Sequence, residues 1–154
     1  MAKIVFHVGG PSFHPVAEQA QQIALWLGDG YTCRIAGGLD AFALLEDCDL
    51  FVAMGLHWTG MDADWAGNMV YQPLEARHQA AFETYVAAGR PIIAYHGGIA
   101  AYDDWPRYGE LLGFTWVWDV TTHSPLGDYT VNILPTGHPI VAGTGDEPVD
   151  PGRW

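Results

Sequence analysis

Short apolar runs alternate along this chain with segments whose apolar residues recur at helical spacing, and this alternation restricts the fold more than any other feature. The run at 3–8, KIVFHV, is almost continuously apolar and ends at two glycines. Such a run is typical of a parallel strand that is covered on both faces. Residues 31–37, 48–55 and 91–97 form three similar segments. Strands interleaved with helices predict an α/β fold with a doubly wound, mainly parallel sheet.

The segments between these strands predict helices and loops. We expect a helix from about Val16 to Leu27, a short one at 39–47 with Asp40 as its cap, and one at 74–89. Residues 56–73 are expected to form a loop. The remaining expectations are irregular backbone and then a short helix at 101–113, late antiparallel or edge strands at 114–123 and 128–134, and a turn at 137–140.

Length and composition favour one compact domain over residues 1–154. Domains commonly have about 100–150 residues, and 49% of this chain is hydrophobic, enough for a substantial core. The chain has seven Trp, seven Tyr and six Phe. Such an aromatic excess is typical either of a pocket for a flat or sugar-like ligand or of a bulky core with an interface. Composition leaves both interpretations open.

The charge balance excludes several classes of partner. The net charge is −12, with only six Lys and Arg, whereas nucleic acid and anionic membranes require a basic face. A neutral or cationic ligand fits better, or an anion whose charge a metal offsets. The first ten residues hold one lysine and lack the long apolar stretch and cleavage site of a signal peptide. We therefore expect a soluble cytoplasmic protein.

The sequence YHGG at 95–98 is the strongest candidate site. It follows a strand, and its glycines permit the sharp turn of a nucleophile elbow, with His96 at the elbow instead of Ser or Cys. Covalent acyl chemistry is therefore not supported. His96 is a candidate general base or metal ligand, because imidazole serves in both roles near neutral pH. The alternative is a structural histidine bonded to a backbone carbonyl. We favour a functional role.

Two further histidines are expected at the same edge of the sheet. His14 follows the first strand and His57 the third, so both should lie beyond the carboxyl ends of strands, where such folds bind ligands. With His96 they form a candidate metal site, most plausibly for zinc, and Asp62 and Asp64 lie nearby in sequence. For His14, capping of the next helix is an equally good interpretation.

Other polar groups have competing interpretations. Asp103 and Asp104 are candidates to orient a histidine or to bind sugar hydroxyls, although at least one of them is expected to cap the helix near Pro106. His7 and His78 are interpreted as structural. Cys33 and Cys48 are too few and too unpatterned for a disulfide framework or a zinc knuckle, so we expect inert core thiols.

The stretch LEARHQAAFETYVAAGRPIIAYHGGIAAYDDWPRYGELLG, followed by GHPIVAG, resembles the ThuA-like (trehalose utilisation) family. The resemblance runs from the first strand to about Gly143 and is most specific over 82–113. It implies a flavodoxin-like three-layer sandwich related to class I glutamine amidotransferases, with His96 at the position of their nucleophilic cysteine. Family members continue past GHPI with further strands, so either the last strands are missing here or the domain is a compact variant.

The resemblance also implies a role in sugar utilisation without cysteine-dependent glutaminase activity. We expect a site at the sheet edge that acts on a trehalose-type disaccharide or a keto-sugar derivative, by hydrolysis or isomerisation. The expected catalytic residues are His96, Asp103 and Asp104. The expected substrate contacts are Gly10, Trp58, Gly97, Gly98, Trp105 and Tyr108, with Trp58 and Trp105 as stacking faces. The candidate metal ligands are His14, His57 and His96.

Two other functions remain open. A non-catalytic sugar-binding or assembly module would keep the amidotransferase-like scaffold and bind a ligand without turnover. A true amidotransferase using Cys33 or Cys48 is disfavoured, because neither cysteine lies at an elbow. The Trp-rich segments 58–65 and 114–118 also make a homodimer interface conceivable.

Overall fold

The computed structural model describes residues 1–125, 127–134, 136–142 and 147–149. By its internal contacts the chain divides into two compact units, Met1–Thr121 and Thr122–Trp154. Each unit is described by itself. Gly143, at the end of the expected family match, lies outside the described residues.

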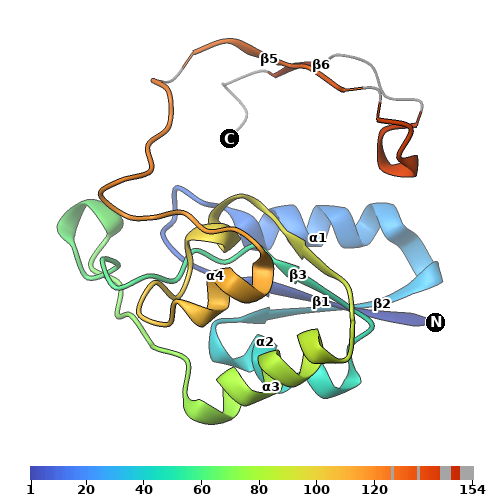
Figure 1. The fold of residues 1–154 in the computed structure, drawn as a ribbon, viewed down its shortest axis with the longest axis horizontal. Helices are drawn as coiled ribbons and strands as arrows, with labels where there is room; N and C mark the ends of the chain where they lie inside the picture. Colours follow the sequence, from blue (N-terminus) through green and yellow to red (C-terminus); the bar gives the residue numbers. More distant parts are fainter. Residues whose placement is uncertain (126, 135, 143–146, 150–154) are drawn as a thin grey trace. The chain divides into compact units, whose positions relative to one another are not determined.

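The first unit contains a parallel sheet of four strands in the order β2-β1-β3-β4. The strands are β1 (Ala2–Val8), β2 (Tyr31–Gly37), β3 (Leu50–Ala53) and β4 (Ile92–Ala94), and every neighbouring pair is parallel (Figure 1). Helices flank this sheet on both faces. The predicted flavodoxin-like α/β sandwich is therefore confirmed.

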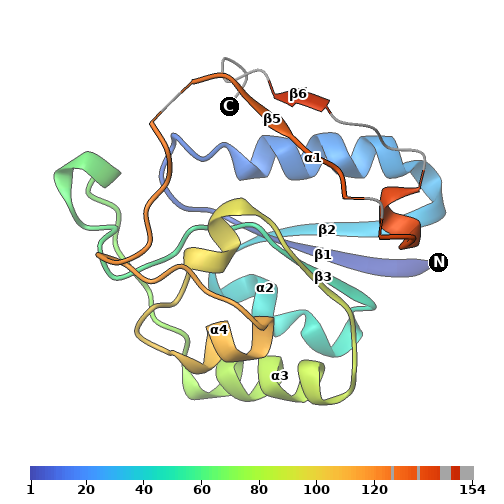
Figure 2. The same cartoon turned by 45° about the horizontal axis from the view of Figure 1, so that its top comes forward.

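The helices cover the two faces unequally. Helix α1 (Val16–Leu27) lies on one face, and α2 (Leu39–Ala43), α3 (Ala76–Ala87) and α4 (Arg107–Leu112) lie on the other (Figures 1 and 2). Short 3-10 turns connect several elements: η1 (Gly28–Gly30), η2 (Leu45–Asp47), η3 (Asp64–Ala66) and η4 (His96–Ala100). The turn η4 follows β4 and contains the predicted elbow.

Alternate residues of the strands supply two separate cores, because successive side chains point to opposite faces of a sheet. On the α1 face, Phe6 and Met54 pack in one cluster with Ala20. On the opposite face, Phe51 packs in a second cluster with Phe82. All five of these side chains are at most 1% exposed. A strand buried on both faces has to be apolar throughout, which explains the continuous run at 3–8.

Several predicted elements are shorter than expected, and the fourth strand covers only Ile92–Ala94 of the predicted 91–97. The helix predicted at 39–47 ends at Ala43 and continues as the separate turn η2. The N-cap of α2 is Gly38 without a side-chain capping bond, so the predicted cap at Asp40 is wrong. The third strand ends at Ala53, because the N–H groups of Met54 and Gly55 both donate to the carbonyl oxygen of His7 and so leave the regular ladder.

The strand predicted at 114–123 is absent, and this prediction is wrong. The backbone turns at 117–121, where the N–H groups of Val120 and Thr121 donate to the carbonyl oxygen of Val117. Asp119 within this turn has a φ of 64°. The alternation in sequence arises instead from Trp116 and Trp118, which pack against the buried cluster of the 56–73 loop.

The second unit contains a small antiparallel pair, β5 (Tyr129–Val131) with β6 (Glu147–Val149). The first of these strands confirms part of the prediction at 128–134. The predicted turn at 137–140 is present as η5 (Pro139–Val141), where Nδ1 of His138 accepts a hydrogen bond from the backbone N–H of Ile140 at 3.2 Å. Across the described residues of both units, no helix is long and apolar enough to cross a membrane.

The turn after β4 packs so closely on β3 that only glycine fits at Gly98. A Cβ atom on Gly98 would lie 2.1 Å from the carbonyl oxygen of Ala53 and 2.5 Å from its carbonyl carbon. These are backbone atoms of a central strand and have little freedom to move away. Tyr108 supports the turn from the core, since its hydroxyl donates to the carbonyl oxygen of Gly98 at 3.1 Å.

We predict that Gly98→Ala lowers the free energy of unfolding by ~1–3 kcal/mol, the usual cost of overpacking, as measured by urea denaturation. Gly30→Ala is the matched control, because a Cβ on Gly30 meets no atom within 4 Å, and its effect should stay within about 0.5 kcal/mol. Equal stabilities of the two variants would contradict the close packing of the turn on β3.

Candidate functional site

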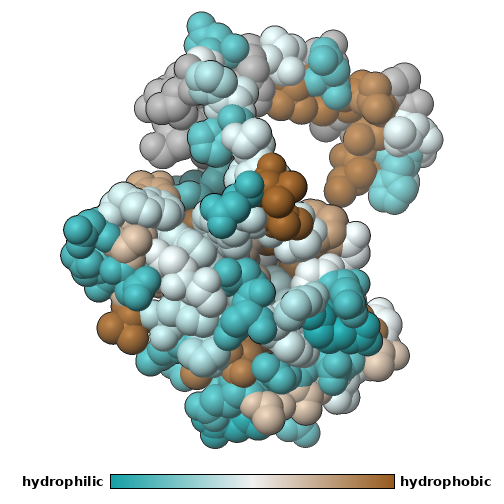
Figure 3. Space-filling model, turned by 60° about the vertical axis from the view of Figure 1, so that its left-hand side comes forward, coloured by the Kyte–Doolittle hydropathy of each residue, from teal (hydrophilic) through white to brown (hydrophobic). Residues whose placement is uncertain are grey.

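The loops that follow β1, β3 and β4 meet beyond the carboxyl ends of these strands. The chain leaves β1 for β2 on one side and reaches β3 on the other, so the strand order reverses between β1 and β3. Ligands bind at this position in open α/β sheets. Figure 3 views the molecule from this end, and its lower part, the first unit, is mostly teal and white with isolated brown patches. The end of the first unit is therefore largely polar.

His14 and His96 are in contact at this edge, as the sequence predicted for two of the three histidines. Their ring centroids lie 4.7 Å apart, with 52° between the ring planes. Gly97 permits this approach, because a Cβ on it would lie 3.2 Å from Nδ1 of His14. The cap of α1 is Pro15, without a side-chain capping bond, so His14 does not take the capping role that was its alternative.

The backbone at His96 has the geometry of an elbow. Its φ is 43°, an uncommon value for a residue other than glycine. The turn is fixed on both sides of this residue: the N–H of Tyr95 donates to Ala53 O at 2.8 Å, and that of Gly98 donates to Tyr95 O at 2.9 Å. The His96 side chain is exposed. Backbone strain of this kind is concentrated at functional sites.

The environment keeps His14 uncharged. Burial, with a smaller contribution from the nearby His96, lowers the pKa of His14 to about 4. Near neutral pH, His14 therefore presents a neutral imidazole with one N–H donor and one nitrogen acceptor. Since like charges at this distance repel, the pair favours a single proton over two.

His57 lies with a different group of side chains, and this corrects the expected three-histidine site. Its Nε2 is 3.2 Å from the carbonyl oxygen of Val8, and its ring stacks on Tyr102 at 5.9 Å. The ring of His7 is 5.1 Å from that of His57. The backbone carbonyl of Val8 holds the His57 ring at the end of β1, away from a common site with the other two histidines.

The structure also bears on the predicted zinc site. No group of three or more His, Cys, Asp or Glu within the described part of the chain is arranged to hold a metal ion. His14 and His96 would supply two nitrogen ligands, whereas protein zinc sites usually take three or four protein ligands. The residues present therefore do not fit the predicted zinc site.

Asp103 and Asp104 attach to the 56–73 loop. The two oxygens of Asp103 accept hydrogen bonds from the backbone N–H of Thr59 at 2.8 Å and from its hydroxyl at 2.7 Å. Asp104 accepts a hydrogen bond from the hydroxyl of Tyr71. The N-cap of α4 is Pro106 without a side-chain capping bond, so the predicted cap is wrong. The catalytic role expected for these carboxylates stays a prediction.

Three residues expected to contact substrate are largely enclosed. Trp58 is 3% exposed and stacks on Trp118 at 5.0 Å, so it offers no face to a ligand. Trp105 packs against the core cluster around Phe82. Tyr108 is 1% exposed, and its hydroxyl donates a hydrogen bond to the carbonyl oxygen of Gly98 in the elbow. Periodicity and composition could not distinguish these inward-facing rings from outward-facing ones.

The expected glycine contacts act through packing. A Cβ on Gly10, whose φ is 111°, would lie 2.5 Å from the carbonyl oxygen of Leu56. Gly97 and Gly98 are buried. These glycines let the loops after β1, β3 and β4 approach one another, and their role as substrate contacts stays a prediction.

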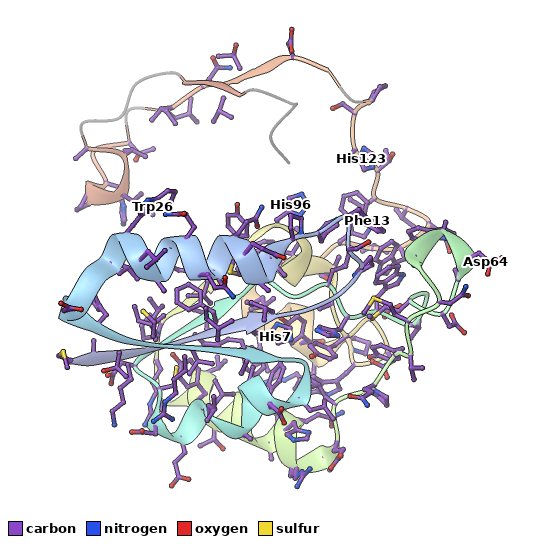
Figure 4. All side chains as sticks on the ribbon, turned by 180° about the vertical axis from the view of Figure 1, so that it is seen from behind. His7, Phe13, Trp26, Asp64, His96 and His123 are labelled. Atoms are coloured by element: carbon purple, nitrogen blue, oxygen red, sulfur yellow. The ribbon has the colours of Figure 1, made fainter. Side chains whose placement is uncertain are left out.

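Two exposed aromatic rings near the histidine pair were missed as site residues. Phe13 is 51% and Trp65 is 65% exposed, and their rings stack with centroids 6.4 Å apart. Phe13 also meets the ring of His14 edge-on at 5.0 Å. Figure 4 shows Phe13 and His96 at the N-terminal end of α1, with His7 in the sheet. Two features of the sequence could have indicated them: Phe13 directly precedes His14, and Trp65 lies in the Trp-rich loop.

His7 lies in the core beneath the loops, as predicted for a structural residue. It is fully buried, and its Nε2 is 3.0 Å from the hydroxyl of Tyr102. Burial, and secondarily the nearby His57, holds the pKa of His7 well below its usual range. Burial also lowers the pKa of His57, against a smaller opposing effect of its bond to Val8.

The two cysteines are free, as expected. Cys48 is buried and Cys33 is partly buried. Burial raises the pKa of both thiols, which disfavours the reactive thiolate form. Both residues belong to the packing of the sheet and its connections.

Comparison with known proteins identifies no relative: no protein-family model, curated protein or solved structure matches the chain. The resemblance to the ThuA-like family, and the activity that it implies, therefore stay predictions.

We predict that the protein becomes less stable as the pH falls from about 7.5 to about 5, because the unfolded chain binds protons at His7, His14 and His57 near a pKa of about 6.5, whereas burial lowers the pKa of all three in the folded state. The loss begins near that value and continues as the pH falls toward the lower folded pKa values. Urea denaturation across this range measures it, at up to about 1.4 kcal/mol per pH unit for each histidine.

His7→Phe should flatten this pH dependence, since it removes the most deeply buried of these imidazoles. Phe82→Leu, at a buried ring of the same unit that carries no titratable group, is the control and should leave the slope unchanged. A His7→Phe variant with the full wild-type slope would show that the acid sensitivity arises elsewhere.

Proposed function

We propose that this protein acts on a neutral carbohydrate, a trehalose-type disaccharide or a keto-sugar derivative, at the His14–His96 pair. The observation that carries the proposal is the contact of the exposed, strained His96 with the neutral His14 at the carboxyl edge of the sheet. The elbow holds no cysteine, so the proposed activity does not include glutaminase chemistry.

In the proposed isomerisation of a keto-sugar, His96 is the general base. A ring nitrogen of His96 takes the proton from the carbon next to the substrate carbonyl, and the electron pair of the broken C–H bond moves toward the carbonyl oxygen. The resulting enediolate moves its hydroxyl proton to the former carbonyl oxygen, and the protonated His96 returns the carbon-bound proton to the former carbonyl carbon, so that the adjacent oxygen becomes the new carbonyl. A positioned base of this kind accelerates proton transfer by about 10²–10⁴-fold.

His14 is proposed to stabilise the substrate oxygen in this step. Because its pKa is about 4, His14 stays neutral and does not compete with His96 for the transferred proton. Its N–H can donate a hydrogen bond to the oxygen that gains negative charge. Neutral donors that are already oriented toward a developing charge contribute strongly to catalysis.

Phe13 and Trp65 are proposed to bind the apolar face of a sugar ring. They are exposed, stacked on each other and adjacent to His14, and aromatic rings combine large contact area with little conformational freedom. A net charge of −12 favours a neutral substrate over a phosphorylated one. Asp103 and Asp104 keep free lone pairs for substrate hydroxyls beside their bonds to Thr59 and Tyr71.

A non-catalytic sugar-binding module is the second candidate. The observation that favours it is the use of both carboxylates to hold the 56–73 loop. In this case the aromatic rings bind the sugar, and the histidines only supply hydrogen bonds.

We predict that the keto derivative of trehalose exchanges carbon-bound hydrogen for deuterium when it is incubated with the protein in D₂O, as followed by proton NMR. His96→Gln should slow this exchange on the order of 100-fold or more, because the base is lost, while the dissociation constant measured by calorimetry changes little. Trp26→Ala, an exposed tryptophan within α1, is the matched control and should change neither quantity.

The two candidates give different results in this experiment. Binding of trehalose or its keto derivative without any exchange would reject the catalytic proposal and support the binding module. Absence of binding by both sugars would reject both candidates.

We also predict that Trp65→Ala weakens binding of the same sugars about three- to tenfold, the usual effect of losing one aromatic stacking contact. The rate of exchange at saturating substrate should remain close to the wild-type value, since Trp65 does not touch the transferred proton. Calorimetry and saturation kinetics measure the two effects separately. An unchanged dissociation constant would remove Trp65 from the proposed site.

A further inference from the structure

A cavity of about 690 Å³ lies beyond the carboxyl end of β2, between α2 and α3. These helices lie next to each other on the face of the sheet opposite α1 (Figure 2). Its volume is within the range of about 300–1,000 Å³ that is common for small-molecule sites. The lining includes His57 but neither His14 nor His96, so the cavity is separate from the site proposed above.

The charges around this cavity disfavour an anion. Asp40 and Glu46 contribute carboxylates to the lining, and Arg77 contributes a guanidinium. Arg77 is already paired with Glu75, at 3.0 Å, and its side chain is 74% exposed. An anionic ligand would therefore meet two like charges and a cation that is neutralised elsewhere. Water screens the exposed carboxylates, so they attract a cation only weakly.

Histidine and amide side chains and apolar surface make up the rest of the lining. His78 is only 4% exposed, and its Nδ1 is buried without a hydrogen-bond partner. A buried polar atom without a partner is unfavourable, because it has lost its hydrogen bonds to water. The side chain amide of Gln72 adds a donor and an acceptor, while the half-buried Leu39 supplies apolar surface.

We propose that the cavity between α2 and α3 is a second binding site, for a neutral polyhydroxylated molecule of sugar size. Its hydroxyl groups would pair with His78, Gln72 and the lining carboxylate of Asp40, and its C–H face would lie on the half-buried Leu39. This function goes beyond the chemistry at His96 and does not depend on it. His78, which the sequence suggested to be structural, is thereby assigned to ligand binding.

The test uses NMR of the histidine ring protons in the intact protein, with the His78 signal assigned by its loss in His78→Gln. Excess trehalose should shift the His78 signal, and it should do so equally in the Trp65→Ala variant, in which binding at the first site is expected to be weaker. Ala43→Trp, which places an indole in the cavity from the exposed side of α2, should weaken the response at least about tenfold. Ala80→Trp is the matched control, an exposed alanine of α3 outside the lining, and should leave it unchanged.

Each other result overturns the inference. A His78 signal that does not respond to trehalose would reject the site, as would an unchanged response in a folded Ala43→Trp variant. A response to spermidine or to glucose 6-phosphate, but not to trehalose, would reject the neutral ligand class. A His78 response that weakens in Trp65→Ala in parallel with binding at the first site would show that trehalose occupies a single site.

Discussion

The close packing of the η4 turn on the end of β3 is the contact on which the site depends. Gly98 lies against the carbonyl of Ala53 with no room for a Cβ, and the N–H of Tyr95 donates to that same carbonyl oxygen. Together with the hydroxyl of Tyr108, these contacts fix the backbone on both sides of His96. Because the turn is held from the sheet and from the core, His96 can remain in a strained conformation with its ring exposed.

A polar network, buried at His7 and Tyr102 and exposed at Asp103, holds the other loops at this edge. His7 bonds to the hydroxyl of Tyr102, the N–H of Tyr102 donates to the carbonyl oxygen of His57 at 2.6 Å, and Asp103 bonds to Thr59. These bonds connect β1 to the loops after β3 and η4. The lowered pKa values of His7 and His57 are the electrostatic cost of placing imidazoles in an apolar core, where only their neutral forms are tolerated.

His57 lies between the two regions proposed to bind ligands. Its Nε2 is near the carbonyl of Val8 at the end of β1, and its ring also lines the cavity between α2 and α3. Gly9 provides the space for it, since a Cβ there would lie 2.7 Å from its Nε2. His57, which follows β3 in sequence, thus lines the cavity on the α2–α3 side of the sheet. His14 and His96, in contrast, meet at the N-terminal end of α1.

The sequence by itself determined the parallel α/β sheet and the elbow at 95–98, because strand burial and turns leave local signals: continuous apolar runs, and glycines directly after them. Tertiary structure alone decided which side chains share a site. Trp58 and Trp65 lie in one loop, yet only Trp65 is exposed, and His57 lies apart from His14 and His96 although all three follow strands. Local spacing carries no information about contacts between residues far apart in sequence, such as the carbonyl of Val8 with His57 or the indole of Trp118 with Trp58. These assignments therefore required the packed structure.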